Sequence, residues 1–177
     1  QLCNIPPFIC QLHKLEVLLA CNNRLVSLPE EIGKLDRLMD LDVSCNEISQ
    51  LPAQIADLES LRSLNVRRNL LVELPPGLCR LHLNRLDFSD NKISHVPRDY
   101  RNMESLQEII LDHNPLVSPP ASICTRGRVH IMKYLQNEAI REDRKRGLLS
   151  ENDMRKNFRK SNSIQPSLSD EFKYMET

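Results

Sequence analysis

Apolar residues recur in a fixed frame along most of this chain. Within residues 41–61 the frame holds Leu41, Val43, Ile48, Leu51, Ile55, Leu58 and Leu61, and the polar residue Asn46 stands inside it. This spacing is neither the alternation of a long strand nor the stripe of an amphipathic helix. The frame returns from residues 15, 61, 83 and 106, so that an asparagine recurs every 22 or 23 residues at Asn23, Asn46, Asn69, Asn91 and Asn114. The chain therefore contains five repeats in phase.

Each repeat predicts a short strand followed by a sharp turn. The apolar residues of the segment LxxLxL point into a core, and strands of successive repeats stack ~4.8 Å apart in one parallel sheet. The proline of the dipeptides at Pro29, Pro52, Pro75 and Pro97 fixes φ where the chain turns toward the opposite side. The full pattern LxxLxLxxNxLxxLPxxIxxL is that of a leucine-rich repeat. It predicts an α/β solenoid, a horseshoe with a parallel sheet on its concave face.

The repeated asparagine has a structural explanation. The turn after the strand buries backbone N–H and C=O groups, and an unpaired buried group is costly. An asparagine amide offers one acceptor and two donors, so it can bond backbone groups of its own and of the next repeat. We favour this ladder over the alternative, a role in binding a ligand.

After residue 124 the pattern changes. Apolar residues at steps of three and four predict an amphipathic helix, on a stripe of Val129, Ile131, Met132, Leu135 and Ala139. Gly147 is a stop signal for this helix. Because the stripe begins where the last repeat ends, we favour a helix that caps the apolar edge of the repeats. The alternative is a basic helix that lies on a membrane surface or binds a partner.

These patterns divide the chain into three parts: leucine-rich repeats over 1–124, a capping helix over 125–147, and a tail over 148–177. The tail is polar, charged and rich in serine, which predicts disorder. Residues 1–12 match the second half of a repeat, with Pro6 in phase. We therefore expect the repeats to start mid-repeat, without an N-terminal cap, as a piece of a longer protein.

Composition narrows the function classes. No stretch approaches the ~20 apolar residues of a membrane-spanning helix. The formal net charge is zero, with a mildly acidic repeat region and a basic segment over 126–160. The short run Arg144–Arg146 is a weak argument for nucleic-acid binding, which we do not predict.

The six cysteines predict packing rather than chemistry. They form no CxxC pair, and Cys10, Cys79 and Cys124 occupy a repeat position that Gly33 and Ala56 share. A small residue suits that position, and cysteine is a small apolar one. Redox or metal chemistry is the alternative. The lack of a disulfide framework favours a reducing, intracellular compartment.

Catalytic signatures are missing from the sequence. It contains no GxSxG, HExxH, GxxxxGK or GxGxxG motif. Asp112 and His113 lie beside Asp90 on the predicted sheet face, which resembles an acid–base cluster, but an open, wet surface favours plain solvated charge. We therefore predict a chain that is not an enzyme and holds no cofactor or metal.

The outward side of the sheet is the candidate site. Its middle carries arginines, flanked by aspartates, and Arg68 and Asp90 are expected to be lateral neighbours. Exposed ion pairs contribute only ~0–1 kcal/mol to stability, so we expect these charges to select a protein partner by complementarity. The predicted partner-binding residues are Asp42, Arg62, Arg67, Arg68, Arg85, Asp87, Asp90, Asp112 and His113.

The end of the repeats carries a more specific resemblance. The form LxxLPxxIxxL resembles the intracellular, Ras-group leucine-rich repeats. Residues 112–139 resemble the last repeat and cap of the leucine-rich repeat and calponin homology domain-containing proteins, through Asn114-Pro115-Leu116, Pro119-Pro120, Ile123-Cys124, Gly127, Val129-His130-Ile131 and Lys133-Tyr134-Leu135. The chain has no calponin homology domain, and residues after Ile140 match nothing in that family.

This resemblance implies a cytosolic or cortical protein tied to the actin cytoskeleton, whose partner is an exchange factor for Rho-type GTPases or a cytoskeletal protein. From the residues themselves we predict a non-enzymatic scaffold with a protein partner on its concave face. Two alternatives stay open: a Ras-pathway or phosphatase-targeting adaptor, and the repeat part of an enzyme whose catalytic domain lies outside this sequence.

Overall fold

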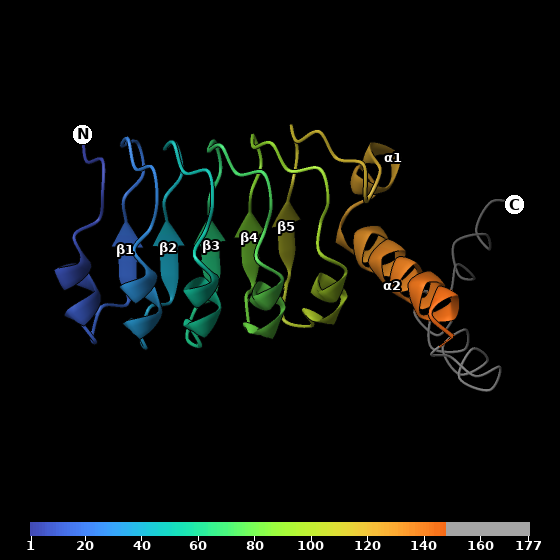
Figure 1. Cartoon of the computed structure of the whole chain (residues 1–177), viewed down its shortest axis with the longest axis horizontal. Helices are drawn as coiled ribbons and strands as arrows, with labels where there is room; N and C mark the ends of the chain where they lie inside the picture. Colours follow the sequence, from blue (N-terminus) through green and yellow to red (C-terminus); the bar gives the residue numbers. More distant parts are fainter. Residues whose placement is uncertain (148–177) are drawn as a thin grey trace, which may run out of the picture. The chain divides into compact units, whose positions relative to one another are not determined.

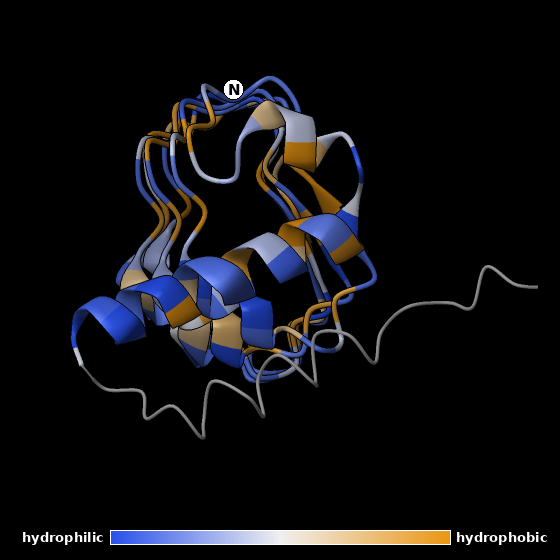
Figure 2. Ribbon diagram, turned by 90° about the vertical axis from the view of Figure 1, so that its right-hand side faces the viewer, coloured by the Kyte–Doolittle hydropathy of each residue, from blue (hydrophilic) through white to orange (hydrophobic). Residues whose placement is uncertain are grey.

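The computed structural model describes residues 1–147. Five short parallel strands form one sheet in sequence order (Figure 1): β1 (Val17–Leu19), β2 (Asp40–Asp42), β3 (Ser63–Asn65), β4 (Arg85–Asp87) and β5 (Glu108–Ile110). Each strand follows a 3-10 helix: η1 (Pro7–Gln11), η2 (Glu30–Lys34), η3 (Ala53–Asp57), η4 (Pro76–Arg80) and η5 (Arg98–Asn102). Seen end on, successive repeats superimpose, with strands on one side of the coil and 3-10 helices on the other (Figure 2). The predicted solenoid is confirmed.

The core follows the repeated frame. Equivalent apolar residues pair across the sheet in register, as Leu18, Leu41, Leu64, Leu86 and Ile109 do. Leu41, Leu64 and Leu86 are fully buried. Because every repeat buries its apolar residues against its neighbours, the sequence spacing alone sets the register of the sheet.

Each predicted proline turn opens a 3-10 helix. Pro29, Pro52, Pro75 and Pro97 directly precede η2 to η5, with φ between −66° and −56°, close to the value that the proline ring imposes. Backbone hydrogen bonds stabilise these helices; Ile32 N–H, for example, donates to the Pro29 carbonyl at 3.1 Å. The sequence predicted the turn but not the helix, since a single 3-10 turn carries no periodic signal of its own.

The asparagines form the predicted ladder in the opposite direction. Oδ1 of Asn46 accepts from Leu25 N–H at 2.9 Å, and its Nδ2 donates to the carbonyls of Ala20 at 3.0 Å and Val43 at 2.9 Å. Leu25 and Ala20 belong to the preceding repeat, not to the next one as predicted. The turn of the preceding repeat presents these backbone groups toward Asn46. The asparagine of each repeat therefore forms hydrogen bonds with the backbone of the repeat before it.

The small-residue position is tightly packed, as predicted. A Cβ atom on Gly33 would lie 2.8 Å from the backbone oxygen of Gln54 in the next repeat. Cys10 is buried at the same position, and Cys79 and Cys124 pack against the core. Burial raises the pKa of all three thiols, which lowers their reactivity.

Within the described residues, two α-helices follow the repeats, α1 (Ala121–Cys124) and α2 (Arg128–Lys145). Ile131 and Leu135 of α2 are buried in the same core as Leu106 and Leu111 of the last repeat. Val129 is 53% exposed, so its place in the predicted apolar stripe is wrong. It stands two residues before Ile131, which puts it on nearly the opposite side of a helix with 3.6 residues per turn.

The first compact unit of the chain is Gln1–Glu138, and a second unit begins at Ala139. Helix α2 ends at Lys145, and Gly147 follows with φ of +69°, a conformation that suits a glycine stop. The tail predicted over 148–177 lies outside the described residues.

Candidate functional site

The outward side of the five strands, together with the turn that follows each strand, forms a continuous surface that we call the sheet face. Strand pairing aligns its residues in lateral rows, one of which is Leu19, Asp42, Asn65, Asp87 and Ile110. The residues two and three positions after this strand row form two further rows, which we call the turn rows. The first is Cys21, Ser44, Arg67, Ser89 and Asp112, and the second is Asn22, Cys45, Arg68, Asp90 and His113.

Polar residues at the strand ends hold the turns in place. Oδ1 of Asp42, Asn65 and Asp87 each accepts a hydrogen bond from the backbone N–H two residues later, at 2.9 to 3.1 Å. Asp87 is only 4% exposed and also accepts from the Ser89 hydroxyl at 2.7 Å. Asp87 was predicted as a partner contact, but these bonds commit it to the fold, as happens when an aspartate closes its own turn.

The second turn row has a left-handed backbone. Asn22, Cys45, Arg68, Asp90 and His113 all have φ between 53° and 56°. Asparagine, aspartate and histidine tolerate this conformation better than most residues, so Cys45 and Arg68 occupy it at a greater cost. This departure from strand geometry explains why consecutive residues such as Arg67 and Arg68 can both point outward.

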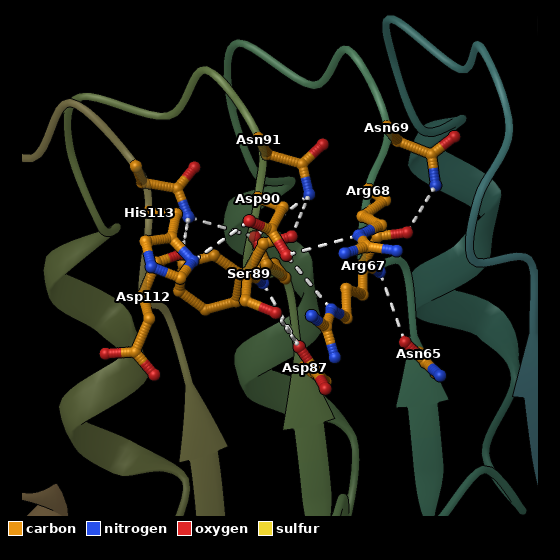
Figure 3. Close-up of polar contacts among 12 residues, drawn as sticks. Asn65, Arg67, Arg68, Asn69, Asp87, Ser89, Asp90, Asn91, Asp112 and His113 are labelled. Atoms are coloured by element: carbon orange, nitrogen blue, oxygen red, sulfur yellow. Dashed lines mark hydrogen bonds and ion pairs between the residues drawn. The ribbon is translucent and has the colours of Figure 1, made fainter.

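Asp90 is the centre of a charged cluster (Figure 3). Its Oδ2 lies 3.0 Å from Nε of Arg67 and 3.7 Å from Nε of Arg68, and its Oδ1 lies 2.9 Å from Nδ1 of His113. The hydrogen bond from Arg67 is the main reason why the pKa of the Asp90 carboxyl falls below its ordinary value. The predicted pair of Arg68 and Asp90 is present, but Arg67 is the closer partner.

The other predicted residues separate from this cluster. Arg85 binds Glu108 at 2.7 Å and approaches Asp87 at 3.5 Å. Arg62 donates instead to the carbonyls of Glu59 at 3.1 Å and Leu61 at 2.9 Å, before the start of β3.

Two further acidic residues complete the face. The prediction omitted Glu108, although the alignment of repeats places it opposite Arg85 on the next strand. Asp112 is exposed, and Figure 3 shows its carboxylate pointing away from Asp90. The predicted central group of four arginines is therefore one pair around Asp90, one arginine bound to Glu108, and one held by its own turn.

Comparison with known families decides what this architecture is. A family model described as "Leucine rich repeat" matches residues 13–71 and 61–116. The chain belongs to the leucine-rich repeat family. A comparison with curated proteins finds none that matches.

Solved structures, among them two described as leucine-rich repeat proteins, are similar to this chain. A leucine-rich repeat protein of Leptospira interrogans has 30% identity and a TM-score of 0.53, over 63% of this chain and 34% of that one. The ectodomain of the Arabidopsis thaliana membrane receptor kinase GASSHO1/SCHENGEN3, in complex with Casparian strip integrity factor 2, has 36% identity and a TM-score of 0.58, over 64% and 14%. A plant ice-binding protein has 30% identity and a TM-score of 0.58, over 64% and 38%. This chain thus spans less than two fifths of each.

The geometry of this leucine-rich repeat surface suits recognition. Arg67 and Arg68 are exposed, so their charges act in a wet, screened environment. Among residues 1–147, no three histidine, cysteine, aspartate or glutamate side chains gather in a way that could hold a metal ion. Over the same residues, no helix combines the length and apolar character that crossing a bilayer requires.

Proposed function

We propose that this chain is a non-catalytic interaction module that holds a protein partner on its sheet face. The observation that carries the proposal is the cluster around Asp90, in which side chains from three successive repeats are held together on an exposed surface. Ion pairs at such exposed positions add only ~0–1 kcal/mol to folding stability. The fold therefore has little use for them, whereas a partner gains from charged groups that are already in position.

Relatives of known structure support this proposal. One is a plant peptide hormone receptor solved in complex with RGF2, at 30% identity and a TM-score of 0.60, of which this chain covers 19%. Leucine-rich repeats generally mediate protein–protein interaction. Arginine, which is enriched among residues that dominate binding energy, stands at the middle of the sheet face in this chain.

The resemblance of residues 112–139 to the leucine-rich repeat and calponin homology domain-containing proteins makes the proposal more specific. On that basis the partner is an exchange factor for Rho-type GTPases or a cytoskeletal protein. The setting is then the cytoplasm at the cell cortex.

Blocking the sheet face should abolish partner capture. Ser63 is a half-buried outward residue of the central strand, in register with Asp40 and Arg85. Ser63→Trp places a bulky ring in the middle of the face without entering the core. We expect at least about a tenfold loss of captured partner, which corresponds to 1.4 kcal/mol of binding energy. The measurement is a pull-down from cytosolic lysate with quantitative mass spectrometry.

The matched control is Glu30→Lys with Glu31→Lys, in η2 on the other side of the repeats. This variant should keep its partners. Circular dichroism establishes that both variants are folded. A folded Ser63→Trp chain that keeps its partners, beside a control that loses them, would move the binding surface to the 3-10 helices.

A further inference from the structure

Arg67 and Arg68 present hydrogen-bond donors that the fold does not use. Their side chains are 45% and 62% exposed. Each approaches Asp90 through Nε alone, which leaves the two terminal nitrogens of each guanidinium group. Within residues 1–147 these terminal nitrogens make no hydrogen bond. The two adjacent nitrogens of a guanidinium form the edge that binds a carboxylate or phosphate with two parallel bonds.

Arg68 occupies a costly backbone position for little structural return. Its φ of 53° is left-handed, a conformation that disfavours a long side chain. Its ion pair with Asp90, at 3.7 Å, is longer than a hydrogen bond, and its side chain is exposed. Asn22 and Asp90 fill the same repeat position with residue types that tolerate it better. The fold uses the Arg68 backbone, whose N–H donates to the Ser89 carbonyl at 3.0 Å, but gains little from the long Arg68 side chain at this position.

The charge of the cluster indicates what it binds. Two arginines and one aspartate leave one positive charge. One carboxylate neutralises that charge, whereas a phosphate dianion would exceed it. Asp90 itself shows that a carboxylate fits between these guanidinium groups, because its Oδ2 lies within 3.7 Å of Nε in both.

We propose that Arg67 and Arg68 are the binding site for a single acidic side chain, a glutamate or aspartate, on an extended segment of the protein partner. The segment lies along the sheet face and presents its carboxylate to the terminal nitrogens of both arginines, while Asp90 accepts a hydrogen bond from Nε of Arg67 and forms a longer ion pair with Arg68. This inference rests on the proposed function and names the chemistry of the partner.

Arginine side-chain NMR of the ¹⁵N-labelled full chain tests the inference. The probes are short Gly/Ser peptides with blocked ends that differ only in a central Glu, Gln, Lys or phosphoserine. The Glu peptide should shift the Arg67 and Arg68 resonances with about tenfold tighter binding than the Gln peptide, a ratio that one charge-assisted contact provides. The Lys peptide should leave these resonances unmoved. Arg67→Gln with Arg68→Gln should lose the preference, and the control Arg85→Gln should keep it.

Several results would overturn the inference. If the Glu and Gln peptides bound equally well, the arginines would not recognise a carboxylate. The same conclusion would follow if the variant Arg67→Gln with Arg68→Gln bound the Glu peptide as tightly as the original chain does. Tighter binding of the phosphoserine peptide than of the Glu peptide would assign the site to phosphate instead. None of these results would contradict the proposed function. That proposal fails separately, if the Ser63→Trp variant retains its partners.

Discussion

Replacing Leu135 by aspartate should destabilise the repeat unit by about 3–5 kcal/mol, because the change removes a buried leucine and buries an unpaired carboxylate. Leu135 is fully buried and shares a core with Leu106 and Leu111 of the last repeat. A solenoid needs its apolar end covered, and we propose that this part of α2 covers it. Urea denaturation followed by circular dichroism measures the loss.

Val129→Asp is the matched control for that prediction. It introduces the same charge on the same helix, but Val129 is 53% exposed, so the expected change stays within about 0.5 kcal/mol. If Leu135→Asp were as mild as Val129→Asp, α2 would not close the core. The helix would then be available to a membrane surface or a partner.

Asn69→Ala should cost about 3 kcal/mol, since it removes the partner of several buried backbone groups, each worth ~1–3 kcal/mol when left unpaired. Asn69 is buried, and its Oδ1 accepts from Ile48 N–H at 3.0 Å. Its Nδ2 donates to the carbonyls of Val43 at 3.0 Å and Val66 at 3.1 Å. The alanine variant should therefore lose contacts in two repeats at once, in a denaturation experiment at constant pH.

The control for this prediction is Asn102→Ala. Asn102 is the exposed last residue of η5, so its loss should change the free energy of unfolding by no more than about 0.5 kcal/mol. Comparable losses for the two variants would mean that the ladder contributes nothing beyond an ordinary surface asparagine.

Most of the fold could be predicted from the sequence because a repeat architecture uses only contacts between neighbours. The spacing from Leu41 to Leu64 to Leu86 already sets the register of the sheet. The direction of the asparagine ladder could not be predicted, since Asn46 stands between two similar repeats and the sequence favours neither. Similarly, the spacing of apolar residues at steps of three and four placed Val129 on the predicted apolar stripe, but in the helix Val129 faces away from the core.

The candidate site was predictable as a surface but not as a set of contacts. The outward rows followed from the alternation of strand residues, yet Asp87 is buried because its own turn folds over it. The closer pairing of Asp90 with Arg67 depends on left-handed backbone at Arg68 and Asp90, which redirects both side chains. An arginine carries no sequence signal for such a conformation, because among residues other than glycine it is asparagine and aspartate that adopt it most readily.

Hydroxyl-radical footprinting of the chain in complex with a captured partner tests most directly whether the sheet face binds protein. Leu19 and His113 are exposed residues at the two ends of this face, and Phe8 is an exposed residue in η1, outside it. Five strands ~4.8 Å apart make a face roughly 20 Å wide, a span that a partner of ordinary interface size covers. Partner binding should therefore protect Leu19 and His113 from oxidation and leave Phe8 as reactive as in the free chain. Protection of Phe8, with Leu19 and His113 still fully oxidised, would contradict the account.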